Sequence, residues 1–200
     1  EQVYWVGQHG LPVTDLMAWL IDRRNLEAAW QRVRASDGAD TPGFDGMTVS
    51  SLNGTAESWL GRIAEDLRRG KWTPQPVRYF EISKANGESR QVGILTLRDR
   101  IVHTALTQVL EPLLEPRFHD DSFGFRPGRS VPAALRRVQQ LLNTDHSPTL
   151  GGFTAAARLD VARCFDTVNL PLLRSRLREF IADDQFFEVI DPLLANSAKL

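Results

Sequence analysis

The sequence has little cysteine and no long hydrophobic run: its 200 residues include one cysteine, Cys164, and no apolar stretch long enough to cross a membrane. A single cysteine excludes a disulfide framework and any zinc site built from cysteines, which fits a reducing compartment. No signal peptide is recognisable, so we expect a cytoplasmic protein without a membrane partner. Hydrophobic residues still make up 42% of the chain, enough for a core in one domain or two small ones.

An excess of charge of one sign is also missing, because the formal net charge is −1. The charges are nevertheless distributed unevenly. Residues 62–137 carry 14 Lys and Arg against 9 Asp and Glu, whereas residues 1–61 carry 4 against 8 and residues 138–200 carry 6 against 8. A basic middle segment can form a phosphate-facing surface in a neutral chain. A solvated charge pattern without a partner explains the same counts, and charge alone does not decide between the two.

Apolar residues at helical spacing dominate the N-terminal part. Thr14 or Asp15 is expected to cap a first helix and Asn25 a second, since each precedes an amphipathic run. Trp19 and Trp30 lie on the apolar sides of these helices. We therefore expect both tryptophans in the core.

A loop and two further helices are predicted in the next part of the chain. Gly, Asp and Pro content indicates a loop at residues 36–47, and a helix at residues 56–69 is expected to end against a left-handed Gly70. The sequence TLRD at residues 96–99 is a capping box, and apolar spacing continues the helix behind it to about Leu114.

A β-hairpin is predicted between these helices. Residues 77–84 (VRYFEISK) and 89–95 (SRQVGIL) alternate as strands do, and they flank Asn86-Gly87. Lys84 and Arg90 are expected at its tip, where two long cations can converge on a triphosphate and stabilise the leaving pyrophosphate. The alternative is that both cations only keep the tip soluble.

The segment FHDDSFGFRPGRS at residues 118–130 predicts a rigid loop, because two glycines and a proline hold the backbone in a tight path. Arg126 and Arg129 are expected to project from it, and arginines on a rigid loop position phosphates well. Ser130 is expected to cap a helix at residues 131–142.

Residues 155–168 (AAARLDVARCFDTV) carry the strongest chemical signal. Residues 157–161 have the length and composition of a short buried strand, which would place the carboxylate of Asp160 where water is scarce. A buried carboxylate needs a cation, and a bound metal is the simplest one. An Asp that caps a turn at the strand end is the alternative. Cys164 is interpreted as a small packing residue rather than a reactive thiol.

These blocks together resemble the reverse transcriptases of the group II intron lineage and their CRISPR-associated relatives. Residues 155–168 are similar to motif A, and SFGFRPGRS followed by an alanine- and leucine-rich helix is close to a signature of that group. The segments RNLEAAWQRV, GFDGMTV and RRGKWTPQPV resemble the N-terminal extension and the first fingers block. The sequence departs from the family at Ser83, Ala85, Gln91 and Leu95, where prolines are common.

The resemblance implies an α+β fold: a right-hand polymerase fingers/palm fragment, helix-rich, with a β-hairpin and short palm strands. It places the N-terminal extension and first fingers helices in residues 1–70. The fingers then occupy residues 71–153, and the palm begins in residues 154–200.

The resemblance also implies an RNA-directed DNA polymerase that adds dNTPs to a DNA or RNA primer on an RNA template, with two Mg²⁺ ions or Mn²⁺ in their place. Asp160 would be catalytic, and with the carbonyl of Val161 it would hold the metals. The nucleotide would be bound by Lys84, Arg90, the amides of Arg163 and Cys164, and Phe165 as a steric gate against a ribose 2′-hydroxyl. Template or RNA contacts would come from Lys71, Arg78, Val92, Arg126 and Arg129.

Residues 181–184 read IADD and imitate the Tyr-Ala-Asp-Asp of motif C in that family. Helical patterns on both sides make Asp183 an expected N-cap instead, and only 23 positions separate it from Asp160, too few for motif B. We therefore expect this chain to lack motifs B and C and the thumb, and not to polymerise DNA by itself.

Fused or associated domains are expected partners, either a maturase or thumb domain or CRISPR adaptation proteins. The near-neutral total charge favours a CRISPR-associated or otherwise domesticated enzyme. Two other functions stay open: an RNA-binding, maturase-like or scaffold module without polymerase chemistry, and a structural domain with no nucleic-acid role. The second of these predicts no salt-dependent affinity for RNA.

Overall fold

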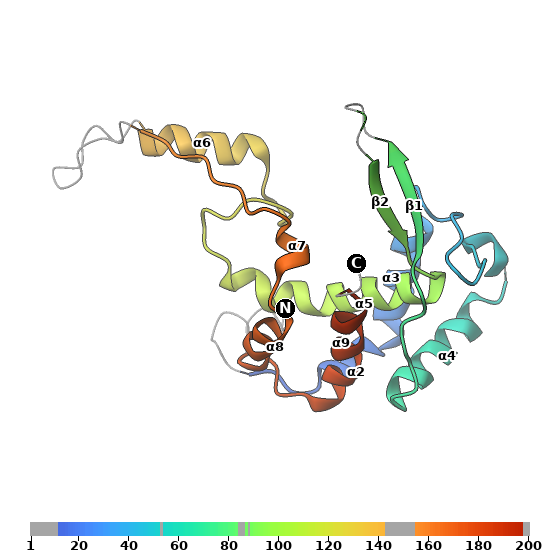
Figure 1. Cartoon of the computed structure of the whole chain (residues 1–200). Coiled ribbons are helices and arrows are strands. Elements are labelled where there is room, and N and C mark those ends of the chain that lie inside the picture. The colour runs from blue at the N-terminus through green and yellow to red at the C-terminus, as the bar shows by residue number, and fades with distance from the viewer. Residues whose placement is uncertain (1–11, 53, 84–86, 88, 143–154, 198–200) are drawn as a thin grey trace.

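The structure is a computed structural model that describes residues 12–52, 54–83, 87, 89–142 and 155–197. Helices predominate, and the strands of this described part form a two-stranded antiparallel sheet (Figure 1). The elements are α2 (Leu16–Leu20), α3 (Arg23–Arg34), η1 (Val49–Leu52), α4 (Ala56–Arg68), β1 (Arg78–Ser83), β2 (Ser89–Ile94), α5 (Leu97–Leu114), η2 (Glu115–Arg117), α6 (Val131–Leu142), α7 (Cys164–Thr167), α8 (Leu170–Arg178) and α9 (Asp184–Ser197).

Helix α5 runs through the middle of the molecule, and the other parts are arranged along it (Figure 1). Its 18 residues give it a length of about 27 Å. The hairpin of β1 and β2 rises at its N-terminal end, and an arm that includes α6 extends beyond its C-terminal end. The helix continues to Leu114, as predicted, although Pro112 lies inside it.

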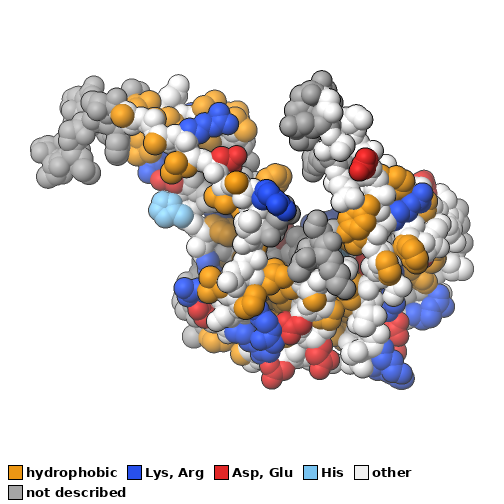
Figure 2. All heavy atoms as spheres, viewed as in Figure 1, with side chains coloured by type: hydrophobic (Ala, Val, Ile, Leu, Met, Phe, Trp, Pro, Cys, Tyr) orange, Lys and Arg blue, Asp and Glu red, His pale blue; other side chains and the backbone are white. Residues whose placement is uncertain are grey.

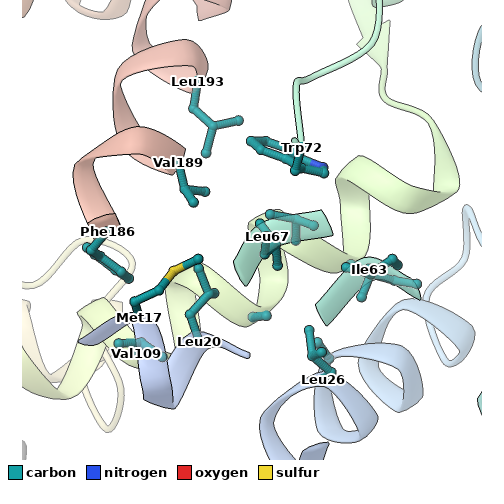
Figure 3. Packing of buried hydrophobic residues seen from close by; sticks show 14 of the residues in the cluster. Met17, Leu20, Leu26, Ile63, Leu67, Trp72, Val109, Phe186, Val189 and Leu193 are labelled. Carbon is teal, nitrogen blue, oxygen red and sulfur yellow. The ribbon is translucent and has the colours of Figure 1, made fainter. Parts of the chain in front are cut away.

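Helices α2, α3, α4, α5 and α9 pack together into what we call the body, and their apolar sides form its core (Figure 3). Trp30 is buried there as predicted, and Trp19 packs partly buried at the edge. The largest fully buried side chains come from all five helices and the segment before α9: Leu16, Leu20, Leu26, Ile63, Leu67, Leu97, Ile101, Val102, Leu113, Ile181, Phe186 and Phe187.

The turn between α8 and α9 is fastened to the start of the described chain. Val13 donates its backbone N–H to the carbonyl of Phe180 at 2.8 Å. The carboxylate of Asp183 accepts from the backbone N–H of Phe186 at 3.0 Å and from that of Met17 at 2.9 Å. Asp183 is therefore a helix N-cap, as predicted, and the IADD sequence opens a helix rather than a β-hairpin.

The predicted cap of the second helix was wrong. Asp22 caps α3, because its carboxylate accepts the backbone N–H of Arg24 at 2.8 Å. Asn25 lies three positions after Asp22, inside the first turn of α3. Its side-chain amide donates instead to the carbonyls of Leu20, at 3.0 Å, and Ala105, at 3.2 Å, so it joins α2 to α5. These acceptors are distant in the sequence, and spacing gave no indication of them.

Other local predictions are confirmed. The hydroxyl of Thr96 accepts the backbone N–H of Asp99 at 3.2 Å, and the hydroxyl of Ser130 accepts an N–H in the first turn of α6 at 3.3 Å. Gly70 ends α4 with a left-handed φ of 63°. Asp15 precedes α2 but makes no side-chain cap hydrogen bond, so this cap was predicted in the right place with the wrong chemistry.

The hairpin also agrees with the prediction. Its antiparallel register runs from Arg78 opposite Ile94 to Ser83 opposite Ser89. Gly87, in the predicted Asn-Gly turn, has a φ of 85°, a conformation that an L side chain adopts only with strain. Every side chain of β1 is exposed, and the hairpin projects from the body (Figure 1).

The arm, which we define as residues 118–142 and 155–168, is packed far less than the body. No residue of α6 is buried. Its apolar stripe of Val131, Leu135, Val138 and Leu142 faces solvent, and Figure 2 shows hydrophobic side chains over this part of the surface. The 4–3–4 spacing of these residues places them on one face of the helix.

A helix-rich fold with a β-hairpin is thus confirmed, whereas the short palm strands are not. Within the described residues, strands occur only in β1 and β2. No helix in this part of the chain is both long enough and apolar enough to span a membrane.

Candidate functional site

The segment that carries Asp160 has no regular structure and is exposed. Residues 155–161 form neither strand nor helix, and all of them are accessible to solvent. The prediction of a buried strand at residues 157–161 was therefore wrong for this chain. A strand needs a neighbour that pairs with its backbone, and none of the described residues pairs with this segment. The argument that Asp160 needs a cation because it is buried does not hold here.

The chain then turns sharply into a short helix. Arg163 has a left-handed backbone, with φ 49° and ψ 47°, and its carbonyl accepts the N–H of Thr167 at 3.1 Å to close α7. Phe165 in this turn is 93% exposed, so it is not a core aromatic in this structure. Cys164 is exposed as well, which contradicts its predicted packing role. The sharp turn leaves Val161 and Phe165 accessible on the same short stretch as Asp160.

The two predicted hairpin cations are not tested by the structure. Lys84 lies outside the described residues. Arg90 is described only by its backbone, which pairs with Ile82 near the end of the sheet. Val92 pairs with Phe80 lower in the hairpin and is half-buried. The convergence of Lys84 and Arg90 on a triphosphate stays a prediction.

Two basic residues at the base of the hairpin have different surroundings. Lys71 is exposed just after α4. Arg78 lies over the ring of Phe80, with 4.5 Å from its guanidinium carbon to the ring centroid, and it donates to the carbonyl of Pro42 at 3.4 Å. Lys71 is therefore open to a partner, whereas Arg78 is already engaged in intramolecular contacts.

The first turn of α5 fixes the base of the hairpin, which sequence reasoning missed. Asp99 is fully buried, and its carboxylate accepts the backbone N–H of Gln75, three residues before β1, at 2.8 Å. Burial raises the pKa of Asp99, and the hydrogen bonds from Gln75 and Thr96 oppose that rise. The segment before β1 is bonded to the first turn of α5, and β2 leads into the same turn, so both ends of the hairpin are held there. The only sequence signal was the Asp at the end of the capping box TLRD, and it indicated a helix cap rather than a bond to Gln75.

The residues on either side of Asp99 fasten two more segments. Arg98 donates to the carboxylate of Asp66 on α4 at 2.9 Å. Arg100 donates to the carbonyls of Gly38, at 2.7 Å, and Thr41, at 2.9 Å, which belong to the predicted loop. Three consecutive side chains therefore tie α4, the loop and the hairpin to α5.

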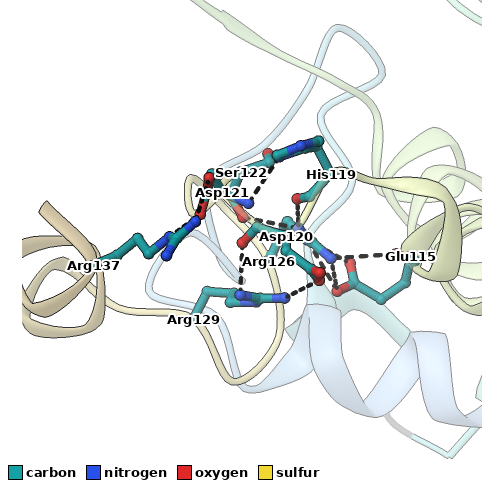
Figure 4. Close-up of polar contacts among 8 residues, drawn as sticks. All are labelled: Glu115, His119, Asp120, Asp121, Ser122, Arg126, Arg129 and Arg137. Carbon is teal, nitrogen blue, oxygen red and sulfur yellow. Dashed lines mark hydrogen bonds and ion pairs between the residues drawn. The ribbon is translucent and has the colours of Figure 1, made fainter. Parts of the chain in front are cut away.

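Arg126 does not project from its loop, contrary to the prediction (Figure 4). Its side chain is only 7% exposed. Its guanidinium bonds the Glu115 carboxylate, with 2.8 Å between Nη2 and Oε1, and it also donates to the carbonyls of Glu115, His119 and Ser122. All five of its N–H donors are thereby directed into the protein. Arg126 holds the loop in shape in this structure, and its predicted RNA contact is not carried further.

Arg129 is more accessible. It donates to the Asp120 carbonyl at 2.9 Å, and its Nη2 lies 3.6 Å from the Asp120 carboxylate, which is itself 97% exposed. Arg137 on α6 forms two hydrogen bonds to the Asp121 carboxylate, at 2.6 and 3.2 Å. These bonds lower the pKa of Asp121. The loop predicted at residues 118–130 is thus held by an arginine–aspartate network (Figure 4).

The described residues do not form a complete metal site. Within them, no three His, Cys, Asp or Glu side chains gather in a way that would hold an ion. Asp160 is a single exposed carboxylate, whereas magnesium sites of polymerases usually combine protein carboxylates with substrate phosphates. We therefore derive no reaction step through a metal from this geometry. A separate hollow of about 590 Å³ between α2, α3 and α4 contains none of the predicted site residues.

Comparison with known proteins is consistent with this arrangement of blocks. The profile of the family described as "Reverse transcriptase (RNA-dependent DNA polymerase)" matches residues 82–199, which include the end of β1, all of β2, the arm and the Asp160 segment. Protein YkfC of Escherichia coli (strain K12) is 39% identical over 156 residues, covering 78% of this chain and 40% of that protein.

Group II intron-encoded protein LtrA of Lactococcus lactis subsp. cremoris is 30% identical over 178 residues, covering 88% of this chain and 28% of LtrA. Nuclear intron maturase 1, mitochondrial, of Arabidopsis thaliana is 29% identical over 102 residues, covering 51% of this chain and 13% of the maturase. The chain thus spans 40% or less of each of these three relatives. With a family profile that matches more than half of its residues, the chain belongs to the reverse transcriptase family, and it is similar to its group II intron-encoded members.

Proposed function

We propose that this chain forms the fingers and the beginning of the palm of an RNA-directed DNA polymerase, which copies an RNA template into DNA from dNTPs. The observation that carries the proposal is the family match over residues 82–199, since it joins β2, the arm and the Asp160 segment in one continuous block. The division into residues 1–70, 71–153 and 154–200 belongs to the same proposal. So do a DNA or RNA primer and the associated domains.

In this proposal the Asp160 segment meets the nucleotide. Asp160 and the Val161 carbonyl are ligands of the divalent metals, Mg²⁺ or Mn²⁺, and the other ligands come from outside the described residues. Phe165 is the gate that excludes a ribose 2′-hydroxyl, and its nearly complete exposure fits a side chain that is free to contact a ligand. Lys84 and Arg90 bind the triphosphate from the hairpin, together with the amides of Arg163 and Cys164.

Primer extension by the chain together with the associated domains of this proposal tests it. With an RNA template, a DNA primer, dNTPs and Mg²⁺, the unaltered protein is expected to extend the primer, and Asp160→Ala is expected to abolish extension because a metal ligand is lost. Asp37→Ala is the matched control, since Asp37 is an exposed aspartate of the loop after α3 without a metal role in the proposal. Extension that survives Asp160→Ala would refute the catalytic assignment. Residues 1–200 alone are expected to be inactive.

A second function is favoured by a different observation, the similarity to two nuclear intron maturases. In this alternative the chain binds RNA to assist splicing and does not use the polymerase chemistry. It predicts RNA binding that is unchanged by Asp160→Ala and weakened when Lys71 and Arg129 become Ala. Binding measured beside primer extension separates the two functions, because only the first makes Asp160 essential to an activity.

A further inference from the structure

A polar hollow of about 430 Å³ lies in the arm, between the loop at residues 119–130 and the start of α6. Its lining on α6 recurs at helical spacing and lies on the face opposite the apolar stripe of that helix. The lining residues are Asp120, Asp121, Phe123, Arg129, Ala133, Arg136, Arg137 and Gln140. None of them lies in the Asp160 segment, so the hollow is separate from the proposed catalytic site.

Three arginines line this hollow, and they are occupied to different degrees. Arg137 is paired with Asp121, and Arg129 with Asp120. Arg136 is exposed, and its guanidinium forms no hydrogen bond or ion pair with any residue that the structure describes. The ring of Phe123 lies 5.5 Å from the guanidinium carbon of Arg129. The hollow thus combines one available guanidinium, two that are held by exposed carboxylates, and an aromatic ring.

The geometry of the two aspartates indicates what these arginines bind. Asp121 presents both carboxylate oxygens to Arg137, in the two-pronged arrangement that arginine also makes with phosphate. Both pairs are accessible to solvent, so a competing anion can replace the carboxylates without disturbing the core. Guanidinium groups from a loop and the helix after it, gathered beside an aromatic ring, suit the repeated phosphates and flat bases of a single strand.

We propose that this hollow binds the phosphate backbone of single-stranded RNA through Arg129, Arg136 and Arg137, and that Asp120 and Asp121 compete with the RNA phosphates for the arginines. This inference rests on the proposed function, which supplies RNA as the nucleic acid. It assigns a contact surface to Arg136 and Arg137 and a restraining role to two acidic residues.

The competition gives a test in which a mutation increases binding. Fluorescence anisotropy of a labelled single-stranded RNA of about 20 nucleotides, titrated with the 200-residue chain at several KCl concentrations, is the measurement. Asp121→Asn is expected to strengthen RNA binding roughly two- to fivefold, the size of an exposed charge pair. Asp184→Asn is the matched control, because Asp184 is an exposed aspartate paired with Arg178 on the body and its replacement changes the net charge equally.

Arg136→Ala provides the second arm, and it keeps the test valid if Asp121→Asn disturbs the loop, since Arg136 holds nothing in the described structure. It is expected to weaken binding roughly two- to fivefold and to reduce the slope of log K against log[KCl] by about 0.7, the value for one phosphate contact in a single strand. Arg176→Ala on α8 is its control and is expected to leave both quantities unchanged.

Three results would overturn the inference: equal effects of Asp121→Asn and Asp184→Asn, RNA binding that does not depend on Arg136, or binding of poly-glutamate with no binding of RNA. The first two leave the polymerase proposal intact. Conversely, the expected RNA binding together with primer extension that ignores Asp160→Ala would support the hollow and refute the polymerase proposal.

Discussion

The body and the arm follow one another along α5, but regular apolar stripes are buried in the body and exposed in the arm. In the body the apolar sides of five helices meet, and side chains such as Leu20, Ile101 and Phe186 are completely buried. In the arm an equally regular apolar stripe on α6 faces solvent, and Leu159 and Phe165 are almost fully exposed. The sequence patterns of the two regions are similar, so the difference comes from the presence or absence of a packing neighbour.

This contrast separates what holds each region together. The body is stabilised by apolar burial, and its polar contacts, such as Asp99 with Gln75, position segments on α5. The arm has no buried apolar residue in α6 and is held mainly by hydrogen bonds around Arg126 and Arg137. We therefore expect the body to respond to loss of volume and the arm to respond to loss of charge.

A matched pair of phenylalanines gives the largest expected effect. Phe186→Ala in the body is predicted to lower the free energy of unfolding by about 3–5 kcal/mol, because it removes a fully buried ring and leaves a cavity. Phe125→Ala in the arm is predicted to change it by less than about 0.5 kcal/mol, because that ring is fully exposed. Urea unfolding followed by circular dichroism measures both. Similar losses in the two variants would contradict the contrast.

The same contrast explains which predictions from sequence succeeded. Features set by neighbouring residues were found: the hairpin around Gly87, the cap formed by Thr96, the left-handed Gly70 and the N-cap at Asp183. Each of these depends on chemistry within a few positions of the chain. Periodicity also identified most helices, because the body buries the apolar faces that periodicity describes.

The failures share one physical cause, which is dependence on a distant partner. A strand at residues 157–161 needs another strand beside it, and its sequence does not say whether one is present. Asn25 is a good cap by type, but acceptors on α2 and α5 take its side chain. Arg126 was expected at the surface because arginines usually lie there, and only the fold shows that Glu115 and two carbonyls of the loop surround it.

Arg126 tests the division between body and arm, because its side chain is buried although the arm around it is poorly packed. Arg126→Met is predicted to lower the free energy of local opening of the loop by about 2–3 kcal/mol, since Glu115 and the loop carbonyls lose charged donors. Amide hydrogen exchange is the measurement. Exchange at the amides of Ser122 and Arg129, which are bonded within the loop, should accelerate, while α5 keeps its protection.

The control for this prediction is Arg176→Met, which removes an exposed arginine whose partner, Glu179, is also largely exposed. It is expected to leave exchange unchanged in both regions, because an exposed ion pair contributes little. If Arg126→Met instead accelerated exchange throughout α5, the arm and the body would open as one unit. The division between them would then be wrong.

The smallest expected effect is a pH dependence that belongs to the body. Burial in α5 lowers the pKa of His103 from its ordinary value of 6.5, and the nearby Asp99 carboxylate partly opposes that change. A histidine with a lowered pKa in the folded state binds its proton less readily there than in the unfolded chain. Its contribution to stability is therefore fully present above pH 6.5 and is lost as the pH falls toward the lowered pKa.

His103→Gln removes this titration while keeping a polar side chain of similar size. Between about pH 8 and about pH 5.5, the free energy of unfolding of the unaltered chain is predicted to fall more steeply than that of the variant. Asp99, whose pKa burial raises from 3.8, is present in both proteins, so its own titration affects both slopes in the same direction. Urea unfolding at each pH measures the slopes. Equal slopes would mean that His103 is hydrated when folded, and the packing of α5 against the body would then be looser on this side than the structure shows.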